Sequence, residues 1–160
     1  MDIALVRVDN RLVHGQILEA WLPFLQATRI EVVDDQVACD FFRETVIRMA
    51  VPREVTVTIS SVEEFAAGAK NGRGPKTIVL FSRISDALRA YDLGFGFKTL
   101  NIGNIYNENC SLCCTPSVLL SDEDIRDVFS LYERGVEIEL RRVPREKPLD
   151  FQDVVRRRNS

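Results

Sequence analysis

Residues 3–22 read IALVRVDNRLVHGQILEAWL, in which an apolar run, a polar loop and an amphipathic stretch follow one another. The branched apolar side chains of residues 3–8 predict a buried β-strand. In residues 14–22, apolar side chains recur at spacings of three and four, which predicts a helix. A strand that leads through a short loop into a helix is the first half of a β-α-β unit.

The same alternation continues along the chain. Further strands are predicted at residues 29–34, 54–59, 76–81, 100–102 and 136–141, and further helices at residues 38–50, 61–70, 86–92, 122–133 and 150–158. This order predicts the α/β fold class, as a three-layer α/β/α arrangement with a mostly parallel sheet and helices on both faces. No linker interrupts the pattern, so residues 1–160 are expected to form a single domain.

The amino-acid composition excludes several classes of protein. The chain has 160 residues, is 46% hydrophobic and 28% charged, and carries a net charge of −3, which is ordinary for a globular protein. These values exclude a disordered, collagen-like or coiled-coil chain, and they disfavour a generic nucleic-acid binder, which would be basic. The N-terminus carries early charges and is not expected to be a signal peptide. We therefore expect a cytoplasmic protein whose four cysteines are free thiols.

Charged groups and the single histidine crowd into the loop after the first strand, where Arg7, Asp9, Arg11 and His14 lie within eight residues. In parallel sheets, ligands bind at the carboxyl ends of the strands. Arginine matches the oxygens of a phosphate, and a helix N-terminus attracts anions. An imidazole there can act as a general base or take a phosphoryl group as a nucleophile. The alternative is that His14 packs on the apolar face of the helix.

The loop also carries a family signature. Residues 7–16 read RVDNRLVHGQ and match the pattern R-x-D-x-R-L-x-H-G-Q at every fixed position. The chain resembles here the IIB component of the bacterial phosphoenolpyruvate:sugar phosphotransferase system, mannose/fructose/sorbose family. The resemblance continues through IEVVDDQVACD, TIVLFSRISDALRAYDLG, LNIGN and VFSLYERGVEIELRRV, and so spans nearly the whole chain.

The resemblance implies a phosphotransferase. His14 would accept a phosphoryl group from a phosphorylated IIA protein and pass it to a sugar that enters through the IIC and IID membrane permease components. It assigns phosphate binding to Arg7, Arg11, Gly15 and Gln16, and organisation of the loop to Asp9 and Asn10. It implies no metal and no cofactor, because the donor is already an activated phosphoramidate. The permease would bring this cytoplasmic protein to the inner membrane.

Other polar residues are expected at the same edge of the sheet. Contacts with the site are predicted for residues that end or follow neighbouring strands: Asp35, Arg83, Asn101 and Gly103. Asp34 and Asp35 can instead cap the helix that follows, and the cap is favoured. Gly135 follows the helix predicted at residues 122–133 and is expected to end it.

One region departs from the family pattern. Asn104 replaces the second glycine of a glycine pair, and the following loop carries C-x-x-C-C as Cys110, Cys113 and Cys114. This loop leaves two alternatives open. One is a regulatory phosphoprotein without a sugar substrate. The other is a redox or metal-binding α/β domain that uses the cysteines, although a structural zinc site usually needs a second pair of ligands.

Overall fold

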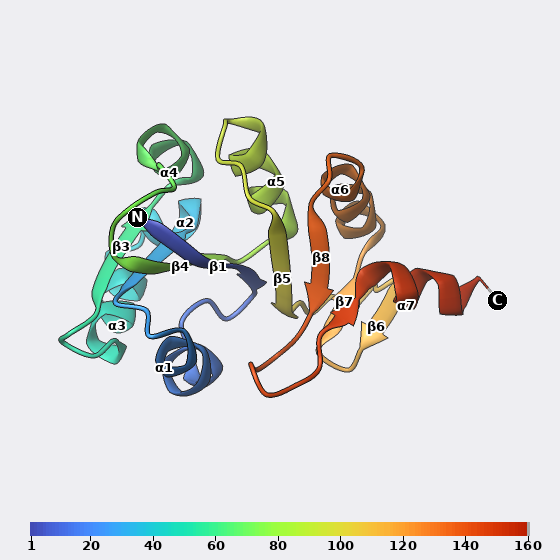
Figure 1. Ribbon diagram of the computed structural model, residues 1–160, viewed down its shortest axis with the longest axis horizontal. Coiled ribbons are helices and arrows are strands. Elements are labelled where there is room, and N and C mark those ends of the chain that lie inside the picture. Colours follow the sequence, from blue (N-terminus) through green and yellow to red (C-terminus); the bar gives the residue numbers. More distant parts are fainter. Residues whose placement is uncertain (160) are drawn as a thin grey trace.

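The computed structural model describes residues 1–159, and its central feature is a seven-stranded sheet in the order β3-β2-β4-β1-β5-β8-β9 (Figure 1). Its strands are β1 (Asp2–Asp9), β2 (Arg29–Val33), β3 (Thr56–Ser60), β4 (Lys76–Phe81), β5 (Thr99–Asn104), β8 (Glu137–Leu140) and β9 (Leu149–Asp150). All neighbouring pairs are parallel except β8 and β9. This confirms the predicted α/β class with a mostly parallel sheet.

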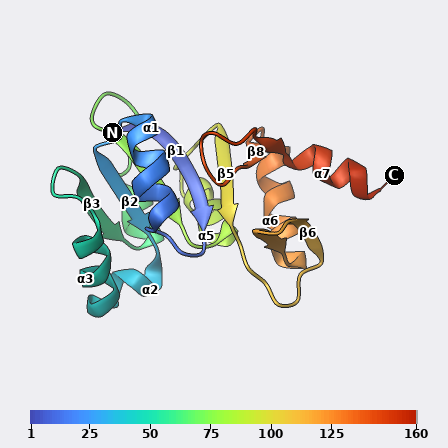
Figure 2. The ribbon, with the colours of Figure 1, turned by 90° about the horizontal axis from the view of Figure 1, so that it is seen from below.

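Helices cover both faces of the sheet. The first face carries η1 (Gln16–Trp21, a π-helix), α1 (Leu22–Leu25), α2 (Asp35–Ala38) and α3 (Phe41–Ala50). The second carries α4 (Val62–Gly68), α5 (Ile84–Asp92), α6 (Asp122–Glu133) and α7 (Phe151–Arg158). Figures 1 and 2 show β1 in the middle of this arrangement, with α1 beside it.

The core is divided between the two faces by the alternation of side chains along each strand. In β4, Val79 and Phe81 belong to the cluster under α4, α5 and α6, whereas Ile78 and Leu80 belong to the cluster under η1 and α2. Side chains of a strand point alternately to opposite faces, so a central strand must be apolar throughout. Continuous apolar runs therefore mark the middle strands of this sheet.

The six strands predicted from the sequence are all present, but some helices differ from the prediction. The first helix begins at Gln16 and not at His14. The backbone carbonyl of His14 accepts the N–H groups of Ile17 and Leu18, and the ring of His14 faces Asp9. The helix predicted at residues 38–50 corresponds to α3 but begins later, at Phe41, because the carboxylate of Asp40 accepts the N–H of Arg43 and caps α3. The short α2 before it shares only Ala38 with the predicted range.

Two expected helix signals are found. The Asp34 side chain accepts the N–H of Val37 and caps α2, and Gly135 adopts φ 92° just beyond α6. The sequence did not predict the small antiparallel pair β6 (Leu112–Thr115) and β7 (Val118–Leu120), nor β9. No helix within residues 1–159 has the length and hydropathy needed to cross a membrane.

Candidate active site

The candidate site lies where β1 ends, at the carboxyl edge of the sheet. β1 pairs with β4 on one side and β5 on the other, and the register places Asp9 opposite Asn104. The backbone N–H of Asn10 donates to the carbonyl of Asn104 at 2.9 Å. The loop that follows is therefore anchored to a neighbouring strand from its first residue.

A tight turn brings the chain back over the end of β1. Leu12 has φ 55°, in the left-handed region, and its N–H donates to the carbonyl of Asp9 at 3.0 Å. A left-handed leucine costs about 1–2 kcal/mol. Its side chain is only 2% exposed and packs in the core beside Ile17 and Trp21. Burial of the side chain offsets the backbone strain and fixes the position of His14.

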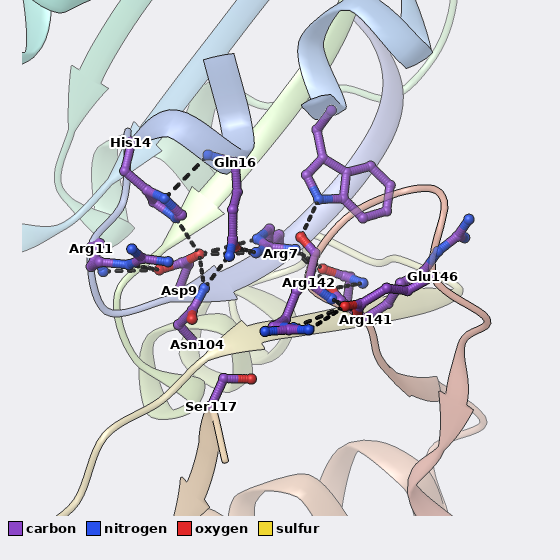
Figure 3. A network of polar contacts seen from close by, with 12 residues as sticks. Arg7, Asp9, Arg11, His14, Gln16, Asn104, Ser117, Arg141, Arg142 and Glu146 are labelled. Atoms are coloured by element: carbon purple, nitrogen blue, oxygen red, sulfur yellow. Dashed lines mark hydrogen bonds and ion pairs between the residues drawn. The ribbon is translucent and has the colours of Figure 1, made fainter. Parts of the chain in front are cut away.

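His14 is held at both ring nitrogens. Its Nε2 lies 2.6 Å from Oδ2 of Asp9, and the backbone N–H of Gln16 makes a long hydrogen bond of 3.4 Å to its Nδ1 (Figure 3). A carboxylate only accepts and a backbone N–H only donates, so the proton lies on Nε2 and the lone pair on Nδ1. The side chain is 12% exposed, which leaves part of the ring open to a partner.

Asp9 is a buried carboxylate surrounded by donors. Its oxygens accept from His14, from Nε and Nη2 of Arg7, from Nδ2 of Asn104 and from the N–H of Arg11. Burial tends to raise the pKa of Asp9, but the hydrogen bond from His14 and the charge of Arg7 together outweigh it and lower this pKa. Asp9 is therefore an anion beneath the imidazole.

Arg7 is a fully buried guanidinium that joins several elements. Besides Asp9, it donates to Oδ1 of Asn101, to the carbonyl of Arg141 and to Oε1 of Gln16. Burial lowers the pKa of Arg7, and the charge of Asp9 partly restores it. All three of its nitrogens are engaged with protein acceptors, and its side chain is 0% exposed. This geometry disfavours the predicted direct contact of Arg7 with phosphate and makes it a support for Asp9.

Arg11 differs from Arg7 in exposure. Its side chain is 53% exposed, and its Nε lies 3.9 Å from Oδ1 of Asp9. Gly15 precedes η1 with helical backbone angles, and the Gln16 side chain accepts from Arg7 and from Asn104. Of the predicted phosphate ligands, Arg11 is the one whose guanidinium faces solvent beside His14.

The remaining predicted residues fall into two groups. Asn10, Asn101 and Gly103 adjoin the network around Arg7 and Asp9. Asn101 accepts from Arg7, and the backbone N–H of Asn10 donates to Asn104. The Asn10 side chain donates to the carbonyl of Ser82 and accepts the N–H of Tyr106. A Cβ on Gly103 would lie 2.0 Å from Nη2 of Arg7, so only glycine leaves room for the guanidinium.

Asp35 and Arg83 make other contacts. Asp35 accepts from Arg89 at 2.6 Å and from the N–H of Val62, whereas Arg83 pairs with Asp86. These contacts tie α2 to α4 and α5 and fix the start of α5, so the structure does not bring either residue to the His14 ring.

Several residues of this hydrogen-bond network were not predicted from the sequence to belong to the site. Asn104 donates to both Asp9 and Gln16, and Arg141 supplies a carbonyl to Arg7. Trp21 donates through Nε1 to the carbonyl of Arg142 at 2.8 Å, and the guanidinium of Arg7 lies 5.7 Å from the centre of its ring. The pairing of β1 with β5 was the signal that could have found Asn104.

The cysteine loop was one candidate for metal binding. Within residues 1–159, no three His, Cys, Asp or Glu side chains come together in a way that could hold a metal ion. Cys110 and Cys113 approach each other, and Cys114 packs against the core.

Comparison with known proteins places this geometry in a family. The family model for the sorbose-subfamily IIB component of the phosphotransferase system matches residues 3–160. This chain belongs to that family. The fructose-specific IIB component of Bacillus subtilis is 35% identical over 98% of this chain and 97% of its own length. The sorbose-specific IIB component of Klebsiella pneumoniae is 32% identical over 97% and 96%.

Solved structures agree with this assignment. The IIB domain of the sorbose permease of Klebsiella pneumoniae has a TM-score of 0.89 at 31% identity and covers 98% of both chains. The mannose-specific IIAB component of Escherichia coli K12 is 29% identical, and the matched region is 49% of that longer protein. The chain is thus a IIB component, a phosphotransferase of sugar uptake, and its family implies interaction with IIA and with IIC and IID permease components. Neither alternative function gains support from these matches.

Proposed function

We propose that this IIB component carries the phosphoryl group on His14, accepts it from a phosphohistidine of a IIA protein and passes it to a sugar. The observation that carries the proposal is the pair of contacts on the ring: Nε2 donates to Asp9, and the lone pair of Nδ1 receives only a long hydrogen bond of 3.4 Å from the N–H of Gln16. His14 is also the single histidine of the chain. No other side chain here can form a phosphohistidine.

The reacting atom in this proposal is Nδ1. Its lone pair attacks phosphorus, the P–N bond of the donor histidine breaks, and the P–Nδ1 bond forms. Positive charge then develops on the imidazole of His14, and Asp9 stabilises this charge through the Nε2–H bond, 2.6 Å long. In the second transfer, the oxygen of a sugar hydroxyl attacks phosphorus and the P–O bond forms as the P–Nδ1 bond breaks. The electron pair of the broken bond returns to Nδ1, and the hydroxyl proton passes to water.

Arg7 acts as a positioning residue. It is buried and bonds to Asp9, Asn101 and Gln16 at once, so it holds the carboxylate at a fixed place and charge beneath the ring. A buried carboxylate without a counter-ion would tend to be protonated. By keeping Asp9 ionised, Arg7 keeps Nε2 protonated and Nδ1 nucleophilic.

Phosphate binding falls to Arg11, with the backbone at Gly15 and Gln16. The exposed guanidinium of Arg11 can swing over the transferred group and offer a planar pair of donors. The backbone N–H of Gln16 already faces Nδ1 and would turn to a phosphate oxygen once Nδ1 is occupied. The positive groups are thus placed where negative charge accumulates.

The relatives support a proposal for the substrate and for the cellular location. Their names specify fructose, mannose, sorbose and N-acetylgalactosamine, so the acceptor proposed here is a hexose or an amino-hexose derivative. Residues 1–160 act as one phosphotransfer domain in the cytoplasm, and meet the inner membrane through the IIC and IID components. Tight docking to the permease would exclude water and so prevent hydrolysis of the phosphoryl group.

The test of onward transfer is a chase. The protein is phosphorylated, freed from the donor, and added to vesicles that carry a cognate IIC and IID pair together with labelled sugar. Labelled sugar phosphate should appear as the phosphoprotein disappears. A phosphoprotein that keeps its group in the presence of a working permease and several hexoses would reject the sugar-transfer role and leave a regulatory one.

A further inference from the structure

Two cysteines outside the phosphotransfer site lie in reach of each other. Cys110 precedes β6 and Cys113 lies within it, and their sulfur atoms are 2.6 Å apart. A disulfide bond is about 2.05 Å long, so a displacement of roughly half an ångström would join them. Cys113 is exposed and Cys110 is partly exposed, so a small reagent can reach them.

The neighbouring Cys114 is more buried than Cys113, although both residues line one surface hollow. Successive side chains of a strand point to opposite sides, so Cys113 faces solvent and Cys114 packs against the core. Burial raises the pKa of Cys114 to about 11, which keeps it a protonated, unreactive thiol at neutral pH. Cys39 lies far away in the sequence, at the end of α2.

A surface hollow adjoins the exposed thiol. It measures about 520 Å³, and its lining includes Cys113, Arg157 and Arg158 with the apolar Leu149 and Val154. Arg158 donates to the carbonyl of Ser111 at 2.5 Å, which holds the end of α7 against the turn between the two cysteines. Figure 1 shows α7 beside β6. The two arginines give the lining of this hollow a positive charge, which favours a reagent that carries carboxylates.

We propose that Cys110 and Cys113 are a thiol–disulfide couple that is oxidised by small anionic disulfides of the glutathione class. The thiolate of Cys113 attacks one sulfur of the reagent, the reagent's S–S bond breaks, and one reagent thiol leaves with a proton. The thiolate of Cys110 then attacks the Cys113 sulfur and releases the second reagent thiol. In total, two protein thiols and one reagent disulfide give one protein disulfide and two reagent thiols.

The first experiment treats the full chain with oxidised glutathione and measures mass and thiol count. Cys110, Cys113 and Cys114 lie in one tryptic peptide, residues 99–126, so the disulfide should lower the mass of that peptide by about 2 Da, the two hydrogens lost. Cys114→Ser is the matched control and should still form it. Cys110→Ser should stop at a mixed disulfide of Cys113 with one glutathione. Retention of all thiols, or an internal disulfide in Cys110→Ser, would overturn the proposal.

The second experiment tests the arginine-lined hollow. Rates with oxidised glutathione and with uncharged hydroxyethyl disulfide are each divided by the rate of free cysteine with that reagent. The anionic reagent should be favoured by at least about threefold, and the Arg157→Gln/Arg158→Gln variant should remove that preference. Equal normalised rates for the wild-type chain would overturn recognition of the anion. Phosphoryl transfer is not read in either experiment, so the two proposals fail separately.

Discussion

Asp9 determines, at the scale of single residues, what His14 can do. The carboxylate is buried, accepts from two arginines, an asparagine and the imidazole, and presents its negative charge to Nε2. An arginine as buried as Arg7 is rare, and here it exists because Asp9 neutralises it. In the proposed mechanism, the reactivity of Nδ1 is therefore set by a pair of buried charges that does not contact the substrate.

Replacing Asp9 should impair chemistry more than binding. Asp9→Asn removes the charge that stabilises the imidazolium and leaves the ring tautomer undefined, so phosphoryl acceptance per folded molecule should fall by about 10²–10⁴-fold. Rapid-quench labelling with a phosphorylated IIA protein measures the rate. Asp34→Asn, at another buried strand end, is the control and should stay within about threefold of wild type. An Asp9→Asn rate close to wild type would refute the electrostatic role.

The same carboxylate makes stability depend on pH. The pKa of Asp9 is lowered in the fold, so its stabilising contribution is present above the unfolded pKa of about 3.9 and is lost as pH falls through the folded value. Asp9→Asn also leaves Arg7 buried without its counter-ion and should cost about 3–5 kcal/mol at pH 7.

Urea unfolding of wild type and Asp9→Asn across pH 3 to 7 tests this dependence. The difference in free energy of unfolding should be constant at neutral pH and shrink below about pH 4. A difference that grows on acidification would have the wrong sign for a lowered pKa.

At the scale of elements, the site requires β1 and β5 to lie close together. Gly103 faces the guanidinium of Arg7, and a Cβ there would lie 2.0 Å from Nη2. Arg7 cannot swing away, because each of its nitrogens is bonded inside the core. The close approach of these strands is therefore as much a part of the site as its charged residues.

Gly103→Ala should disturb both stability and function. We expect a loss of about 1–3 kcal/mol from overpacking and a phosphoryl-acceptance rate reduced at least about tenfold, because displacement of Arg7 moves Asp9. Gly96→Ala is the matched control, since nothing lies within 4 Å of a Cβ at that position. Calorimetry and the same labelling assay distinguish the two variants. Equal behaviour would contradict the packing argument.

The elements also show what the sequence can predict. The strands β1 and β4 contain runs of apolar residues because helices bury both of their faces, whereas β3 and β8 were predicted although they alternate apolar and polar residues. β6, β7 and β9 have only two to four residues each, too few for a pattern to distinguish a strand from a loop. The loop residues His14, Asp9 and Arg11 were predicted as a group. The burial of Arg7 could not be predicted, since it arises from contacts between residues far apart in the chain. Asn104 could have been found only through the pairing of β1 with β5, which places it opposite Asp9.

At the scale of the whole molecule, the core consists of two hydrophobic clusters, and only one of them anchors the loop that carries His14. The cluster under α4 and α5 contains Phe65, whose ring lies 4.7 Å from that of Phe95 and 6.2 Å from that of Phe81. The loop that carries His14 is anchored instead in the other cluster, through Leu12 and Trp21. Changes in the first cluster should therefore lower stability without altering the reacting groups.

Phe65→Ala tests this separation. It should lower the free energy of unfolding by about 3–5 kcal/mol through a cavity, while the acceptance rate per folded molecule stays within about twofold. Phe41→Ala, at a position 84% exposed on α3, should change stability by less than about 0.5 kcal/mol. Denaturant unfolding and labelling are run on the same samples. A large fall in rate for Phe65→Ala would mean that the two clusters are coupled.

The most direct test of the account is the intact mass of the protein after incubation with phosphoenolpyruvate, the two general phosphotransferase proteins and a cognate IIA protein. The account predicts one phosphate that is lost in acid and is absent from His14→Gln, while Cys114→Ser gains it as wild type does. Because the chain has a single histidine, such a phosphate has only one possible position. A His14→Gln variant that still gains the phosphate, or a folded wild-type protein that never does, would contradict the central claim.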